Sequence, residues 1–288
     1  MITLHFAGYQ PPRSVHTRGL YTLRDSVARR SDGKLAITVT DSIVGLGRKA
    51  GDLLTMVEHG ELDGCYFASS YLAGRVPALG VFDQPFQAGS REATFSALDA
   101  ATGASLAAEV AAATAYRVLG FWDNGIRHIS NAVRPIRLPT DCAGLRLRTL
   151  DNTQHQDAFR RLGFRPMFID VADLARAVAD GTVDAQENPL TNMVNFGIQA
   201  HHKHVSLTGH LLGIALLLVN RACFAALPAE LRGVLDAAAR DSEATQRAQA
   251  AAEDADCLKL LADAGVAVIE PDAIDLPAFR AAVADRPA

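Results

Sequence analysis

The stretch DLLTMVEHGELDG at residues 52–64 returns later in the chain as DLARAVADGTVDA at residues 173–185. Both copies fit the pattern D-L-x-x-x-V-x-x-G-x-[L/V]-D-[small]. Each copy predicts a helix with one apolar face, a glycine just past the helix end, and a following strand. Because the two copies lie far apart, we expect two similar α/β lobes, one around each copy.

The segments around the two copies alternate between strand-like and helix-like patterns. Strands that alternate with helices of this length indicate an α/β architecture. The expected elements are strand 3–7, helix 14–30, strand 35–40, helix 52–59 and strand 62–68, then strands near 118–122, 127–130, 145–149, 164–169 and 183–186.

A long proline-free segment lies near the end of the chain. It runs from Pro228, which suits the first turn of a helix, to Gly265, which suits a helix end. A single helix of that span would be about 50 Å long, against roughly 30 Å for a small lobe. We therefore expect one helix that crosses both lobes, with two shorter helices separated by a break as the alternative.

The bulk composition limits the possible classes of protein. The chain has 288 residues, is 49% hydrophobic and 21% charged, and carries a net charge of −4, without a basic cluster that would indicate a nucleic-acid partner. No apolar run reaches the length of a membrane helix, and Leu211–Val219 has the length of a buried strand. The first residues do not read as a signal peptide, so the protein is either cytosolic or has lost its signal.

Motifs for metal, redox, nucleotide or hydrolase chemistry are weak, and we predict no metal, no cofactor and no catalytic residues. The cysteines are not spaced as metal ligands or a redox pair; buried thiols are favoured, with one disulfide as the alternative. Gly45, Gly47 and Gly51 do not form the dinucleotide fingerprint, and no G-x-S-x-G elbow occurs. The residues concerned are Cys65, Cys142, Cys223 and Cys257, and the histidines that we do not expect to converge on an ion, His201, His202, His204 and His210.

Two arginines in the segment GLRLRT at residues 144–149 could bind an anion. Strand alternation places Arg146 and Arg148 on the same face, opposite the leucines. Arginine suits a carboxylate because its planar fork makes two parallel hydrogen bonds. A solvated strand edge is the alternative interpretation.

Two further segments place polar groups at strand ends. In FWDNGIRH, residues 121–128, a turn at Asp-Asn-Gly would set Trp122, Asn124 and Arg127 at a lobe boundary; a core tryptophan beside a surface turn is the alternative. In DAQENP, residues 184–189, Asn188 follows a strand whose carboxyl end is a usual place for ligands. An ordinary strand-to-helix junction would explain the same residues.

Taken in order, these segments resemble the substrate-binding proteins of TRAP (tripartite ATP-independent periplasmic) transporters, the DctP-like family. The resemblance covers about residues 3–270. The matching segments are FAG at 6–8, GFWDNGIRH at 120–128, GLRLR at 144–148, DAQENPL at 184–190, LTGH at 207–210 and the long helix after Pro228.

The resemblance implies a two-lobed, periplasmic-binding-protein-like α/β fold with a cleft between the lobes. With it we expect residues 1–123 and about 213–245 to form lobe I, 124–212 and about 246–288 to form lobe II, and a helix of about 228–264 to cross both. It further implies a periplasmic protein, presumed to have lost its signal peptide, that is a monomer and not an enzyme. It would deliver a small organic acid to a TRAP membrane permease and bind no nucleic acid.

The resemblance also implies roles for individual residues. Arg148 would pair with the ligand carboxylate, Arg127 would be a second anchor and Asn188 a third. The remaining residues expected to line the cleft are Gln10, Ser69, Ser70, Trp122, Asn124 and His210. Val171 and Leu212 replace aromatic residues that are frequent in relatives. An enzyme acting on a small carboxylate and a cytosolic organic-acid sensor are the alternative functions.

Overall fold

The computed structural model describes residues 1–284 and divides them into two compact units. Unit 1 consists of Met1–Leu79, Gly89–Asn124 and Ile214–Ala251. Unit 2 consists of Gly80–Ala88, Gly125–Gly213 and the chain from Ala252 onward. The expected lobe II reaches residue 288, so its last four residues, 285–288, lie outside the described residues. The assignment of these units to functional lobes stays a prediction.

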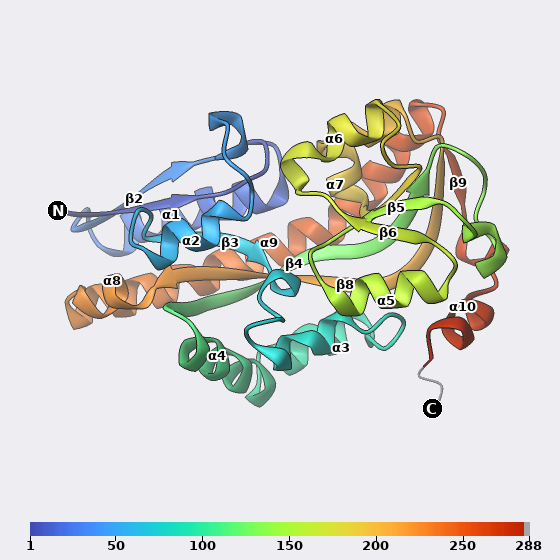
Figure 1. Ribbon diagram of the computed structural model, residues 1–288. Helices are drawn as coiled ribbons and strands as arrows, with labels where there is room; N and C mark the ends of the chain where they lie inside the picture. Colours follow the sequence, from blue (N-terminus) through green and yellow to red (C-terminus); the bar gives the residue numbers. More distant parts are fainter. Residues whose placement is uncertain (285–288) are drawn as a thin grey trace. The chain divides into compact units, whose positions relative to one another are not determined.

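Unit 1 is built on a sheet whose first three strands are parallel. Strand β1 (Ile2–Ala7) lies between β2 (Leu35–Thr40) and β3 (Gly64–Ala68), and β3 pairs in antiparallel fashion with residues 215–219 of β8 (His204–Asn220). Helix α1 packs against β2 and α2 against β3 (Figure 1). The helices are α1 (Val15–Arg30), α2 (Asp52–Glu58), α3 (Arg91–Leu98), α4 (Ala101–Ala113) and α8 (Arg221–Ala226).

The strands of unit 2 are arranged in a similar way. Strand β5 (Arg146–Thr149) lies between β6 (Arg165–Phe168) and β7 (Ala185–Pro189), in parallel with both, and β7 pairs in antiparallel fashion with residues 127–131 of β4 (Tyr116–Asn131). Strand β9 (Ala267–Ile269) pairs with residues 204–206 of β8. The helices are α5 (Thr153–Arg161), α6 (Val171–Ala179), α7 (Leu190–Asn195) and α10 (Leu276–Val283).

Short 3-10 helices and one long α-helix complete the described chain. Helix α9 (Ala229–Asp263) is continuous, so the prediction of one long helix is confirmed over the alternative of two shorter ones. Within residues 1–284 no helix is both long and apolar enough to cross a membrane. The 3-10 helices are η1 (Val44–Leu46), η2 (Ser69–Tyr71), η3 (Pro77–Asp83), η4 (Pro139–Cys142), η5 (Ile198–Ala200) and η6 (Pro271–Ala273).

Local sequence explains why the expected helices form where they do. The Ser14 hydroxyl accepts a hydrogen bond of 3.1 Å from the backbone N–H of Thr17 and so caps α1. Leu20, Leu23 and Val27, spaced to share one helix face, are fully buried. The helix predicted over 14–30 is therefore confirmed to within one residue.

The repeated sequence forms the same local structure in each unit. Gly60 follows α2 with a φ of 76°, and Gly181 follows α6 with a φ of 70°. This left-handed conformation strains any residue with a side chain, which is why glycine occupies both positions. The repeat therefore predicted a helix, a glycine-terminated end and a following strand correctly in both places.

The aspartate near the end of each copy, just before a strand, forms hydrogen bonds with a residue of a neighbouring strand. In unit 1, Asp63 accepts a hydrogen bond of 2.6 Å from the backbone N–H of His5. In unit 2, Asp184 accepts one of 2.9 Å from the backbone N–H of Arg146. In both cases the aspartate backbone N–H donates back to the carbonyl of the same partner residue. The match between the copies thus extends from sequence to hydrogen bonding.

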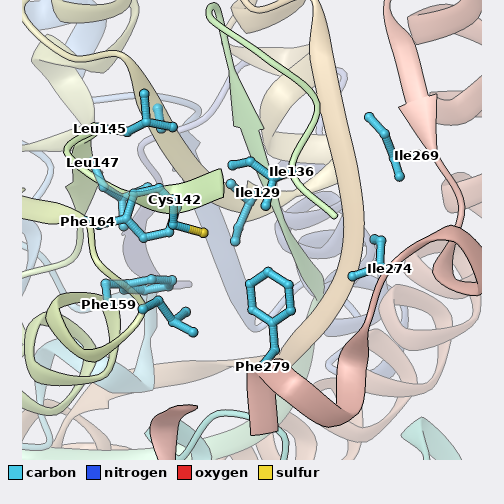
Figure 2. Packing of buried hydrophobic residues seen from close by; sticks show 12 residues of the cluster. Ile129, Ile136, Cys142, Leu145, Leu147, Phe159, Phe164, Ile269, Ile274 and Phe279 are labelled. Atoms are coloured by element: carbon cyan, nitrogen blue, oxygen red, sulfur yellow. The ribbon is translucent and has the colours of Figure 1, made fainter. Parts of the chain in front are cut away.

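Burial of aromatic and aliphatic side chains stabilises unit 2 around β5. Figure 2 shows the Phe279 ring pointing from α10 toward Ile129 and Ile136. Phe159 of α5 and Phe164 meet edge to face in the same cluster, with ring centroids 5.9 Å apart. Phe279 thereby packs α10 against residues that lie more than 100 positions earlier in the chain, Ile129 and Ile136.

The turn predicted at Asp123-Asn124-Gly125 is wrong. Strand β4 continues without reversal through these residues, and Gly125 takes a φ of 94° inside it. The strand residues beyond Gly125 pair with β7, so they do not fold back onto the residues before it. A glycine at positive φ can bend a strand without ending it, and local composition alone does not distinguish this from a turn.

Candidate ligand-binding site

Arg148 is a buried arginine that has no acidic partner within residues 1–284. It lies on β5 in register with Met167 of β6 and Gln186 of β7, and only 1% of the residue is exposed. Its Nε donates a hydrogen bond of 2.8 Å to the carbonyl of Ile169. Its Nη2 is buried without a hydrogen-bond partner in that part of the chain. Because a buried charge is costly unless paired, this guanidinium is suited to an external anion.

Arg146, two residues earlier on the same strand, is in a different environment. It is exposed and donates to both carboxylate oxygens of Asp184, at 2.9 Å from Nε and 2.6 Å from Nη2. These hydrogen bonds hold the pKa of Asp184 below its usual range. The solvated-edge interpretation therefore fits Arg146 but not Arg148.

Arg127 on β4 forms a buried ion pair with Glu187 of β7. Its Nε lies 2.6 Å from Oε2 and its Nη2 lies 2.8 Å from Oε1. Burial by itself raises the pKa of Glu187, but the positive charge of Arg127 and hydrogen bonds from His210 and Arg127 outweigh it and hold this pKa well below its usual range. The charge of Arg127 is thus compensated within unit 2, and its role as a ligand anchor stays a prediction.

His210 on β8 joins this ion pair. Its Nε2 lies 3.3 Å from Oε2 of Glu187, and its Nδ1 lies 2.8 Å from the Thr208 hydroxyl. Burial lowers the pKa of His210 despite the nearby carboxylate. Arg127, Glu187 and His210 consequently form a buried cluster in which the histidine is neutral at pH 7.

Both the nitrogen and the oxygen of the Asn188 side-chain amide form hydrogen bonds with nearby side chains. Its Nδ2 donates a hydrogen bond of 2.5 Å to Oε1 of Gln186, and its Oδ1 accepts one of 3.3 Å from Asn192. The Gln186 amide in turn donates to the Ser130 hydroxyl, which also contacts His202. This chain of buried hydrogen bonds fixes the orientation of the Asn188 amide.

The expected polar residues of unit 1 follow the carboxyl ends of neighbouring parallel strands. Gln10 comes after β1, while Ser69 and Ser70 come directly after β3. The backbone N–H of Gln10 donates a hydrogen bond of 3.2 Å to the Tyr66 hydroxyl. Gln10 and Ser69 are buried and Ser70 is half-buried. Carboxyl ends of parallel strands meet at one sheet edge, where open α/β sheets usually bind ligands.

Trp122 and Asn124 of β4 are also buried in unit 1. The Trp122 ring lies 5.8 Å from the ring of Tyr66, centroid to centroid. Trp122 Nε1 and Asn124 Oδ1 have no hydrogen-bond partner within residues 1–284. The core-tryptophan interpretation accounts for the ring of Trp122 but not for its unpartnered N–H.

The sequence reasoning missed His16. This residue of α1 is fully buried and stacks on Tyr66 with ring centroids 5.1 Å apart. It lies one helical turn before Leu20, on the apolar face of the helix. A histidine among apolar residues at helical spacing was the available signal for a buried polar group.

Within residues 1–284 no group of three or more His, Cys, Asp or Glu side chains is arranged to hold a metal ion. Of the histidines considered as ligands, His202 contacts the Ser130 hydroxyl and His210 contacts Glu187. All four cysteines are free thiols, with Cys223 half-buried and the other three buried. The group that suits an anion is the buried guanidinium of Arg148, whose Nη2 has no hydrogen-bond partner within residues 1–284.

An α/β protein of two units, with a buried arginine that lacks an acidic partner, has the features of a receptor for an anionic solute. The chain belongs to the family of bacterial extracellular solute-binding proteins, family 7 (DctP), whose model matches residues 6–286. This is a family of transporter solute-binding proteins and not of enzymes, so the resemblance and the predicted absence of an enzymatic role are both supported.

Individual relatives agree with this membership. The chain is 31% identical to a solute-binding protein of Verminephrobacter eiseniae, over 91% of this chain and 77% of the relative. It is 28% identical to the 2,3-diketo-L-gulonate-binding periplasmic protein of Escherichia coli, over 91% of this chain and 78% of that protein.

A solved structure shows the same two-lobed α/β fold. The TRAP periplasmic solute-binding protein of Polaromonas sp. JS666, bound to D-erythronate, is 28% identical and superposes with a TM-score of 0.93, covering 99% of this chain and 92% of that one. The α/β fold class expected from the sequence is confirmed. Proteins of this family bind small organic acids and work with TRAP permeases.

Proposed function

We propose that this protein captures a small organic acid through Arg148 and delivers it to a TRAP permease. The observation that carries the proposal is the Arg148 guanidinium, buried on β5 with Nη2 unpartnered within residues 1–284. A bidentate carboxylate would supply the negative charge and the acceptor that this side chain lacks. Hydrogen bonds to charged groups contribute roughly 1.5–3 kcal/mol each, enough to make this contact the main source of affinity.

The ligands of relatives support a carboxylate. The Escherichia coli relative is named for 2,3-diketo-L-gulonate and the Polaromonas protein holds D-erythronate, and both ligands are acids. In this proposal Asn188 donates a second hydrogen bond from its amide, whose orientation Gln186 fixes. Arg127 and His210 act in support, because Glu187 already compensates the charge of Arg127.

We also propose the biological setting of the binding event. The protein works in the periplasm as a monomer, with units 1 and 2 as the lobes that close on the solute. Gln10, Ser69, Ser70, Trp122 and Asn124 are proposed to bind the part of the ligand away from its carboxylate. The net charge of −4 supports the absence of a nucleic-acid partner, since phosphate backbones attract basic surfaces.

Calorimetric titration of ligand-stripped, refolded protein with small carboxylates tests the role of Arg148. Arg148→Ala should weaken binding of a recognised acid by about 100-fold or more, since each 1.4 kcal/mol is a factor of ten. Arg146→Ala is the matched control from the same strand and should leave the affinity within about twofold. Wild-type affinity in Arg148→Ala, or equal losses in both variants, contradicts the proposal.

A further inference from the structure

A continuous chain of buried hydrogen bonds in unit 2 leads from Arg127 to His202. Nη2 of Arg127 lies 3.4 Å from Oδ1 of Asn188, whose Nδ2 donates to Oε1 of Gln186 at 2.5 Å. Nε2 of Gln186 donates to the Ser130 hydroxyl at 2.6 Å, and this hydroxyl lies 2.9 Å from Nδ1 of His202. At most 3% of any of these five residues is exposed. Water therefore competes little for these groups, and each depends on its neighbour in the chain.

The direction of the hydrogen bonds follows from Arg127, because a guanidinium can only donate. Oδ1 of Asn188 is therefore the acceptor at the Arg127 contact, and the NH2 group of this amide faces Gln186. The oxygen of the Gln186 amide accepts that hydrogen bond, which turns its own NH2 group toward Ser130. Each donor along the chain is thus fixed by the acceptor before it.

Ser130 and His202 complete the chain at its other end. The Ser130 oxygen accepts from Gln186, so its O–H needs an acceptor, and within residues 1–284 that acceptor is Nδ1 of His202. Burial lowers the pKa of His202 to about 4, so the ring is neutral at pH 7. A neutral imidazole has one donor and one acceptor nitrogen, so His202 carries its proton on Nε2.

This direction gives Asn188 a donor, and no acceptor, for a ligand. Its Oδ1 accepts from Asn192 at 3.3 Å and faces Arg127 at 3.4 Å. Of the two N–H groups on its Nδ2, Gln186 uses one and the second remains. A carboxylate only accepts, so it suits this N–H. A reversed amide would present its oxygen instead, which disfavours a carboxylate.

The orientation of the Asn188 amide depends on the Ser130 end of the chain. The contact with Arg127 is long for a hydrogen bond, whereas the links through Gln186 and Ser130 are short. Gln186 is in register with Arg148 on one side and with Ser130 on the other, so it joins the strand of the anion-binding arginine to the strand of Ser130. Without the Ser130 hydroxyl, the Gln186 amide loses the acceptor that distinguishes its two orientations.

We propose that Ser130 and His202 are positioning residues of the anion site, which hold Gln186 and Asn188 so that Asn188 offers an N–H to the ligand. Ser130 lies on β4, and His202 lies between η5 and β8. They act through Gln186 and not by contact with the ligand. The inference rests on the proposed function, because Arg148 takes the carboxylate. It adds that preference for a carboxylate over the corresponding uncharged amide depends on these two residues.

Nitrogen-15 NMR of the histidine side chains tests the direction of the chain without a ligand, and the His202→Gln spectrum identifies the signals of His202. At pH 7 we expect the proton on Nε2 and an unprotonated Nδ1. Gln186→Glu replaces the donor to Ser130 by an acceptor, so Ser130 should turn its O–H toward the carboxylate and the proton of His202 should move to Nδ1. A proton on Nδ1 in the wild type, or no change in Gln186→Glu, overturns the inference.

Calorimetric titration with an acid and its amide tests the positioning role. The first acid is D-erythronate, and any acid that binds more tightly in the carboxylate titration replaces it. In Ser130→Ala and in His202→Phe we expect the ratio of acid affinity to amide affinity to fall about tenfold, the equivalent of one hydrogen bond to a charged group. Ser130→Thr keeps the hydroxyl and should stay within about threefold of the wild-type ratio.

Ser206→Ala is the matched control in unit 2. Ser206 is also a buried serine, and its hydroxyl has no hydrogen-bond partner within residues 1–284. This variant should leave the ratio of acid affinity to amide affinity within about twofold. A loss that is merely structural would weaken the acid and the amide alike and leave the ratio unchanged, so the ratio separates positioning from stability.

The outcomes separate this inference from the proposed function. A wild-type ratio in both Ser130→Ala and His202→Phe overturns the inference, while loss of acid binding in Arg148→Ala leaves the carboxylate function standing. A fall in the ratio as large in Ser206→Ala as in Ser130→Ala also overturns it. Wild-type affinity in Arg148→Ala, or binding of none of the acids, contradicts the proposed function itself and removes the basis of the inference.

Discussion

Glu187 and Arg127, 60 residues apart in the chain, form a two-point ion pair between neighbouring strands of unit 2, at 2.6 and 2.8 Å. Both side chains are almost completely buried. The pair explains why two arginines that look alike in sequence differ in the structure. Arg127 already has a carboxylate, whereas Arg148 has none within residues 1–284.

Glu187→Gln should lower the free energy of unfolding by about 3–5 kcal/mol, because it leaves the charge of Arg127 buried without a counterion. Urea unfolding followed by circular dichroism measures the change. Glu61→Gln is the control, since its carboxylate is half exposed and lies 4.0 Å from Arg48. The control should change stability by less than about 0.5 kcal/mol. A loss below about 1 kcal/mol in Glu187→Gln would show that the buried pair contributes little.

His202 should make the protein less stable in mild acid. Burial lowers the pKa of this histidine from 6.5 to about 4. Between these values the unfolded chain binds a proton at His202 and the folded protein does not, so the free energy of unfolding falls as pH falls, by up to about 1.4 kcal/mol per pH unit. The contribution is complete above about pH 6.5 and lost toward about pH 4.

Melting temperatures of wild type and His202→Gln at pH 7.5 and pH 5 measure this effect. The drop between the two pH values should be smaller in the variant than in the wild type. His59→Gln, at an exposed histidine, serves as the control and should show the wild-type drop. An equal drop in His202→Gln and wild type would mean that His202 does not cause the acid sensitivity.

Two glycines should respond to alanine in opposite directions. Gly125 has a φ of 94°, and a Cβ there would lie 2.7 Å from Cβ of Pro189. We expect Gly125→Ala to destabilise the protein by about 2 kcal/mol or more, from backbone strain and overpacking. Gly233 lies in α9, where an added methyl group would point into open space, so Gly233→Ala should stabilise by about 0.5–1 kcal/mol. The melting temperatures of both variants, compared with that of the wild type, measure these changes in stability. A higher melting temperature in Gly125→Ala would contradict the strain argument.

Phe279→Ala should destabilise the protein by about 3–5 kcal/mol, because the ring is fully buried in the cluster of Figure 2 and its removal leaves a cavity. Unfolding in denaturant measures the change in the free energy of unfolding. Leu260→Ala, at a residue that is 51% exposed, is the control and should cost less than about 1 kcal/mol. Equal effects would mean that α10 does not depend on this contact.

The sequence by itself determined the local elements and their class. Apolar spacing at Leu20, Leu23 and Val27 sets the buried face of α1, and Gly60 and Gly181 end their helices because only glycine tolerates the required φ. The repeat around these glycines predicted the same helix-to-strand unit twice. These features depend on residues a few positions apart, so periodicity and backbone sterics are enough to predict them.

Only the tertiary structure decided which polar groups have partners. Strand alternation treats Arg146 and Arg148 as equivalent, yet Asp184 pairs with the first and leaves the second unpaired in the described chain. The pairing of Arg127 with Glu187, the burial of His16, and the uninterrupted course of β4 through Gly125 depend in the same way on residues distant in sequence. Desolvation and hydrogen bonding act between groups that the fold brings together, and local sequence does not specify those neighbours.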